Sequence, residues 1–195
     1  PIINDKTSFI VSGRRTYIDL LAKPFIESAS EGNASGGYFF YDFNAKLNHK
    51  FSERDRLYIS AYMGKDRFYV GEKYTDEDYI SEMDMGLNWG NITSSFRWNH
   101  LFTNKLFANT TLTYSRYLFD TSMEIKDLYL DDVAENRFRY FSGIEDYGTK
   151  IDFDYLPSPD HHIRFGANYT YHTFSPGSME LYERQNATIS QDTSF

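Results

Sequence analysis

The side chains of this sequence that could do chemistry include five histidines. His161 and His162 are adjacent, and neighbouring residues on a strand point to opposite faces, so this pair is poorly arranged to chelate a metal. The sequence favours a polar strand start after a turn at this point. His49, His100 and His172 stand singly, and neither a Ser-His-Asp spacing nor a nucleophile elbow accompanies them. We therefore expect a non-enzymatic protein, with no catalytic residue, no metal ligand and no cofactor.

Carboxylates form two clusters, Asp76-Glu77-Asp78 and Asp127 with Asp131 and Asp132. Carboxylates on a flexible loop can hold Ca²⁺, but the spacing of an EF-hand is absent from both clusters. The sequence favours solvated charges in loops.

A third set of charged residues falls on one side of the expected strands: Lys46, Lys50, Asp146, Lys150, Asp152, Asp154 and Arg164. One interpretation is a polar wall along a path for a solute. The other is that any barrel interior is polar and pairs its own charges. The second is favoured because the sequence identifies no ligand.

The element that positions these side chains is a β-hairpin from Gly37 to Gly64. Apolar and polar residues alternate with period 2 in both arms, and a polar turn at 52–55 separates them. One face of the hairpin is therefore apolar and aromatic, and includes Ala45 and Ala61. The opposite face is polar and includes Asn44 and Ser60.

A similar strand is expected before this hairpin, at 7–21, and others after it, at 83–102, 106–119, 138–156 and 163–174. In 83–102 the apolar phase changes at Gly90-Asn91, which indicates either a tight turn or a β-bulge, where glycine is common. We favour the bulge because it preserves the spacing of the tight turns. Loop composition predicts long connections at 28–37, 72–78 and 120–136, with room for a short helix at 125–130.

Tight turns are expected near residues 53, 104 and 158, at spacings of 51 and 54 residues. The expected arms of about 14 to 20 residues exceed the 9 to 11 that cross a membrane and the 5 to 6 of ordinary globular strands. Long strands with short turns at one end and long loops at the other are typical of outer-membrane barrels. The predicted fold class is all-β, an antiparallel up-and-down meander of about seven long strands that forms an arc of a transmembrane β-barrel.

Composition agrees with this class. The net charge of −8 argues against a nucleic-acid partner, and the absence of cysteine excludes disulfides and Cys-ligated zinc. Mean hydropathy is −0.59, and no apolar run is long enough for a transmembrane helix. Aromatic clusters at 38–41, 138–141 and 169–171 favour girdles at the membrane interface over sugar-stacking platforms. Both ends of the chain look cut, so we expect a processed product or a fragment.

Several segments resemble the barrel of TonB-dependent outer-membrane receptors, nearest to the Bacteroidetes type with a carboxypeptidase-regulatory-like N-terminal domain. They are SFIVSGRRTYIDLL (8–21), FSERDRLYISAYMGKDRF (51–68), and WGN (89–91) followed by RWNHLFTNKLFANTTLTYSRY (97–117). The resemblance covers residues 7–175. It implies a large barrel with a plugged lumen, of which residues 1–195 are a partial barrel domain without the plug.

The resemblance further implies TonB-dependent substrate uptake in the outer membrane of a Gram-negative cell. The implied partners are outer-membrane lipid, a plug domain and the TonB complex reached through other parts of the protein, and a surface lipoprotein. Two alternatives stay open. One is a small closed outer-membrane barrel with a structural or adhesive role. The other is a barrel hydrolase, for which the sequence offers no assembled nucleophile and base.

Overall fold

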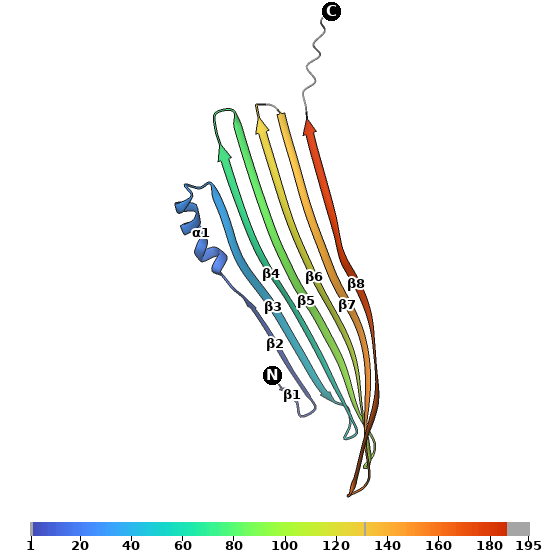
Figure 1. The fold of residues 1–195 in the computed structure, drawn as a ribbon. Helices are drawn as coiled ribbons and strands as arrows, with labels where there is room; N and C mark the ends of the chain where they lie inside the picture. The colour runs from blue at the N-terminus through green and yellow to red at the C-terminus, as the bar shows by residue number, and fades with distance from the viewer. Residues whose placement is uncertain (1, 131, 187–195) are drawn as a thin grey trace, which may run out of the picture.

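The computed structural model describes residues 2–130 and 132–186, which form one eight-stranded antiparallel sheet and one helix (Figure 1). Each strand pairs with its neighbours in sequence, so the sheet is an uninterrupted meander. This confirms the all-β fold class, and the open sheet is consistent with an arc of a barrel. The elements are β1 (Ile2–Asn4), β2 (Thr7–Arg15), α1 (Ile18–Ala29), β3 (Ala34–Lys50), β4 (Asp55–Thr75), β5 (Tyr79–Thr103), β6 (Leu106–Tyr129), β7 (Asp132–Ser158) and β8 (His161–Asn186).

The three expected tight turns are present, at residues 51–54, 104–105 and 159–160. They lie together at the lower end of the sheet in Figure 1, which we call the proximal end. At the opposite, distal end the long loops predicted at 72–78 and 120–136 are wrong. β4 continues to Thr75, and β6 continues to Tyr129 before β7 begins at Asp132, so no helix lies at 125–130.

The acidic distal segments are strands because their charges meet opposite charges on neighbouring strands. Glu82 pairs with Lys73 across β4 and β5, and Glu124 pairs with Arg137 across β6 and β7. The charged composition that predicted loops here reflects ion pairs between neighbouring strands.

Helix α1 replaces part of the strand predicted at 7–21 and part of the loop predicted at 28–37. β2 ends where Arg15 pairs with Tyr41, and α1 then runs beside the part of β3 that β2 leaves unpaired (Figure 1). Arg15 Nη2 donates to the buried Asp19 carboxylate at 2.8 Å, and Thr16 N donates to Phe40 O at 2.9 Å. The helix thus covers an exposed strand edge, which would otherwise offer unpaired backbone groups to another chain.

The phase change at Gly90-Asn91 is neither a turn nor a bulge. β5 pairs continuously with β4 and with β6 through this point, with Gly90 opposite Lys65 and Leu118. A Cβ on Gly90 would lie 2.8 Å from the carbonyl oxygen of Gly64, so the glycine permits a close backbone approach. The strand is regular, and the change of phase is a real exchange of the apolar face.

We call the side of the sheet that carries Ala45 face A and the side that carries Asn44 face B. Since directly paired residues share a face, the register assigns each strand residue to one of them. Near the proximal end, face A is apolar, with Phe9, Leu47, Ile59, Phe96, Leu112 and Phe165. Face B is polar there, with Asn48, Arg97, Thr111, Lys150 and Asn168.

In the distal half the two faces exchange character. Face A becomes charged, with Lys73, Glu82, Glu124, Lys126, Arg137 and Arg139. Face B becomes apolar and aromatic, with Tyr38, Phe68, Met85, Trp89, Phe119 and Phe138. The exchange occurs near the level of Lys65 and Gly90.

The sheet is a single layer, so its apolar side chains have no opposing layer to pack against. Among the described residues, Ala108 is the one hydrophobic residue that is buried, and large side chains such as Tyr169 at 68% and Phe165 at 54% remain exposed. No helix of the described part is long and apolar enough to span a membrane. The apolar surface of face A therefore requires contact with something outside the described chain.

Candidate functional site

The candidate site is the polar surface of face B in the proximal half, which we call the polar wall. The seven charged residues predicted to share one side do share face B. Their charges are largely paired: Lys150 Nζ lies 2.9 Å from Asp152, and Arg164 Nε lies 2.6 Å from Asp154. The interpretation of a polar interior that pairs its own charges therefore describes most of this set.

The middle of the polar wall holds a shallow hollow of about 400 Å³. Gly148 makes part of this room, because a Cβ there would collide with the Thr113 hydroxyl. The lining consists of hydroxyl, amide and charged groups: Arg97, Asn109, Thr111, Thr113, Lys150, Asp152, Asn168 and Thr170. Such a surface offers donors and acceptors of both kinds to a passing polar solute, and it contains no nucleophile held by a base.

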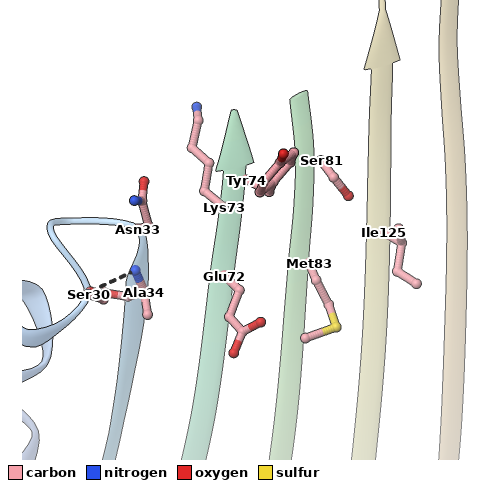
Figure 2. Close-up of a pocket in the computed structure, with 9 residues that line it drawn as sticks. All are labelled: Ser30, Asn33, Ala34, Glu72, Lys73, Tyr74, Ser81, Met83 and Ile125. Atoms are coloured by element: carbon pink, nitrogen blue, oxygen red, sulfur yellow. Dashed lines mark hydrogen bonds between the residues drawn. The ribbon is translucent and has the colours of Figure 1, made fainter. Parts of the chain in front are cut away.

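A second hollow of about 460 Å³ lies at the distal rim, beside the turn that follows α1 (Figure 2). Ser30 Oγ accepts from the Ala34 backbone at 3.0 Å and fixes this turn against the first residue of β3. Across the sheet, Glu72 faces Met83 on face B. The lining of this rim hollow is mixed, with the charged groups of Glu72 and Lys73 beside the apolar side chains of Met83 and Ile125.

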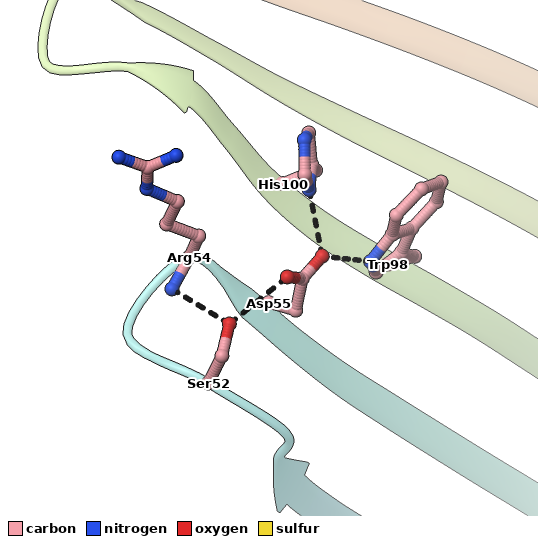
Figure 3. Close-up of polar contacts among 5 residues, drawn as sticks. All are labelled: Ser52, Arg54, Asp55, Trp98 and His100. Atoms are coloured by element: carbon pink, nitrogen blue, oxygen red, sulfur yellow. Dashed lines mark hydrogen bonds and ion pairs between the residues drawn. The ribbon is translucent and has the colours of Figure 1, made fainter.

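At the proximal end, the carboxylate of Asp55 forms hydrogen bonds with three side chains (Figure 3). Its carboxylate accepts from Trp98 Nε1 at 3.1 Å and from Ser52 Oγ at 2.9 Å, and it lies 2.6 Å from His100 Nδ1. The serine and the histidine both contact the carboxylate and not each other, so this is not the geometry of a Ser-His-Asp triad. The cluster ties the turn at 51–54 to β5.

The remaining histidines also have local partners. His161 Nδ1 lies 2.9 Å from Ser158 Oγ and His162 Nε2 lies 2.7 Å from Asp154, so the adjacent pair takes different partners. β8 begins at His161, as the interpretation of a strand start after a turn requires. Within the described residues no group of three or more His, Cys, Asp or Glu side chains could hold a metal ion.

The two acidic clusters differ in position from the prediction. Asp76 to Asp78 do form the short connection between β4 and β5. Asp127, by contrast, lies within β6, where the hydroxyls of Ser81 and Tyr79 donate to its carboxylate and hold its pKa below the usual range. Asp132 begins β7, and Asp131 lies outside the described residues.

Charged residues of distal face A form a lattice of ion pairs, both within strands and between neighbouring strands. Lys126 and Arg137 both donate to Glu124 and lower the pKa of that carboxyl group. Lys73 lowers the pKa of Glu82 in the same way, and Arg139 Nε lies 2.7 Å from Asp120. Long, half-exposed ion-paired side chains of this kind suit a surface that faces water.

No protein-family model matches the chain, and no curated protein matches its sequence. Among solved structures, the chain is similar to a "KdgM porin in complex with disordered oligogalacturonate", at 12% identity and a TM-score of 0.12. The match covers 80% of this chain and 98% of the porin chain. A TM-score this low carries no argument, so the function rests on the sheet itself.

Proposed function

We propose that the chain is an arc of an outer-membrane β-barrel, whose polar wall lines a path for polar solutes across the membrane. The observation that carries this proposal is the exchange of polarity between the two faces of regular, continuously paired strands. A sheet in one uniform solvent gains nothing from such an exchange. A sheet that leaves the lipid partway along its strands requires it on the face that met the lipid.

The length of the apolar band supports this assignment. On β6 the side chains of face A are apolar or uncharged from Leu106 to Leu118, apart from Arg116, which lies opposite Glu145. At about 3.4 Å per residue this is on the order of 40 Å along the strand. A tilt of about 45° reduces it to roughly 28 Å of height, close to the band of about 25 Å of known barrels.

Aromatic residues lie just inside the distal border of this band, four residues before Leu118 on β6. Tyr114, Tyr147 and Tyr171 are direct neighbours across β6, β7 and β8 on face A, and the rings of the first two lie 5.1 Å apart. Tyrosine favours the membrane interface because its ring is apolar and its hydroxyl is polar. The predicted girdle at 169–171 fits this position.

Beyond the border, the distal strands extend into water outside the cell. Their charged face A then faces solvent, and their aromatic face B faces the space above the lumen. The free outer edge of β8 needs a further strand, since a long unpaired edge is an open template for aggregation. We infer that this arc belongs to a larger barrel, as in TonB-dependent receptors, with the plug and the TonB-contacting parts supplied elsewhere in the protein.

The assignment of faces can be tested by single cysteines, because the chain has none of its own. Ala45→Cys and Asn44→Cys place thiols on adjacent residues of opposite faces. In native outer membranes, a charged maleimide should label the variant at 44 and spare the variant at 45, which a lipid-soluble maleimide should label. Equal labelling of both by the charged reagent would overturn the membrane assignment.

The size of the barrel is a separate question, which the intact mass of the native polypeptide from detergent-solubilised outer membranes answers. A mass several times 22.9 kDa supports a large receptor. A mass near 22.9 kDa would favour the small barrel with a structural or adhesive role.

A further inference from the structure

The border between the apolar and the charged parts of face A contains a hollow of about 460 Å³. Its floor is Gly90, which has no side chain and lies between Lys65 and Leu118 in one cross-strand row. Four basic side chains of face A line it: Lys65, Arg67, Arg116 and Arg139. We call these four residues and Gly90 the basic hollow.

The charges of the basic hollow are only partly compensated. Asp120 lines the hollow and pairs with Arg139 at 2.7 Å. Within the described part of the chain, Lys65 and Arg67 form no ion pair, in contrast to Lys73 and Arg137 of the distal lattice. The Arg67 guanidinium carbon lies 5.9 Å from the centre of the Tyr69 ring. A local excess of positive charge is unusual in a chain with a net charge of −8.

The position of the hollow selects the chemistry of its ligand. Directly toward the proximal end lie Met63 and Ile92, which belong to the apolar band and are more than 40% exposed. Directly toward the distal end lies the charged lattice. An amphiphile with acyl chains along the band would therefore place its headgroup among Lys65, Arg67 and Arg116, and phosphate is the headgroup that such a cluster binds best.

We propose that the basic hollow binds the phosphorylated headgroup of an outer-leaflet lipid of the lipid A type. This proposal rests on the proposed function, since it assumes that face A meets lipid. Lys65 and Arg67 supply the unpaired charges, Gly90 leaves room for the phosphate, and the exposed side chains of Met63 and Ile92 contact the first methylenes of an acyl chain. The bound lipid would fix the height of the barrel in the membrane.

The test uses the full-length protein, delipidated in a mild detergent, with bis-phosphorylated lipid A as the probe and native mass spectrometry as the readout. The test variant is Lys65→Gln/Arg67→Gln. The matched control is Lys73→Gln/Arg137→Gln, which removes the same charge from the same face about 20 Å farther along the strands. Heat-modifiable electrophoretic mobility verifies that each variant is folded.

We expect the test variant to lose lipid A affinity by about tenfold or more, because two charge-assisted hydrogen bonds to the phosphate are removed. The control should stay within about twofold, given the short range of screened charge. Equal affinity of wild type and test variant would overturn the proposal. Displacement of lipid A by millimolar inorganic phosphate would assign the hollow to a soluble anion and overturn the lipid assignment.

The failures of the two proposals are distinguishable. Loss of lipid A affinity in the test variant together with the wrong maleimide pattern at residues 44 and 45 would refute the orientation in the membrane and, with it, an outer-leaflet lipid as the ligand. The expected maleimide pattern with no effect of Lys65→Gln/Arg67→Gln would refute the headgroup site alone.

Discussion

The proximal and distal halves of β4 to β7 belong to the same continuously paired strands, yet they carry their apolar side chains on opposite faces. On face A, Ile59 and Phe96 pair in the proximal half, whereas Lys73 and Glu82 pair in the distal half. Since the backbone is the same, the difference must come from the surroundings. Under the proposed function, a strand that passes from lipid into water explains the change of face A from apolar to charged.

The largest effect should come from a charge in the proximal half of face A. Arginine at Ala45, Ala61 or Ala167 should destabilise the assembled barrel by roughly 2–4 kcal/mol, because the guanidinium would lie in hydrocarbon. The same substitution at Thr75, on face A at the distal end, should cost little. Urea unfolding of the full-length protein in lipid vesicles measures both.

The opposite face supplies a second control for this comparison. Arginine at Asn44, Ser60 or Asn168 should be tolerated, because these residues lie on the polar wall. If face A and face B were equally tolerant in the proximal half, the contrast between the halves would lose its membrane explanation.

An intermediate effect is expected where the two halves meet. Gly90→Ala would bring a Cβ to 2.8 Å from the backbone oxygen of Gly64, and a backbone atom cannot give way as a flexible side chain does. We expect a loss of about 1–3 kcal/mol, typical of overpacking. Gly86→Ala is the matched control on the same strand and face, since its nearest neighbour is the Ser122 hydroxyl at 3.1 Å. Similar losses for both would remove the special role of Gly90, and circular dichroism during urea unfolding distinguishes them.

Sequence patterns predicted the proximal half well and the distal half poorly. The turns at 51–54 and 104–105 follow from local composition, and the polar side of the wall follows from strict alternation in 37–64. Both are local signals that need no knowledge of partners. The distal parts of β6 and β7 depend on contacts across the hairpin, such as that of Glu124 with Arg137, which a search for alternation within one strand does not detect.

The exchange of faces was visible in the sequence as the phase change at Gly90-Asn91. The sequence favours a bulge there because a bulge preserves the spacing of the tight turns. The basic hollow follows only from the regular pairing, since its members lie on one face of regular strands. Helix α1 differs from the prediction for another reason: Pro24 lies inside it, and its first four residues, 18–21, end the strand-like segment 7–21.

The smallest effect concerns the distal lattice, and it distinguishes a water-facing ion pair from a buried one. Glu124→Gln removes a carboxylate that Lys126 and Arg137 both contact, at a side-chain exposure of 26%. An ion pair in water should contribute about 0.2–1 kcal/mol and should weaken as salt is added. A loss of several kcal/mol, independent of salt, would mean that this part of face A is buried and that the distal half does not face water.

The pH dependence of stability tests the ion pairs of Glu124 in a second way. Lys126 and Arg137 lower the pKa of Glu124 in the folded state, so its ion pairs stabilise the fold above the pKa of an unfolded glutamate. This contribution disappears as the pH falls through the lowered pKa of the folded state. The stability difference between wild type and Glu124→Gln should therefore shrink on acidification from neutral pH to about pH 3. Urea unfolding at both pH values measures this difference, and a gap that widens on acidification would contradict the ion pairing of Glu124 in the folded state.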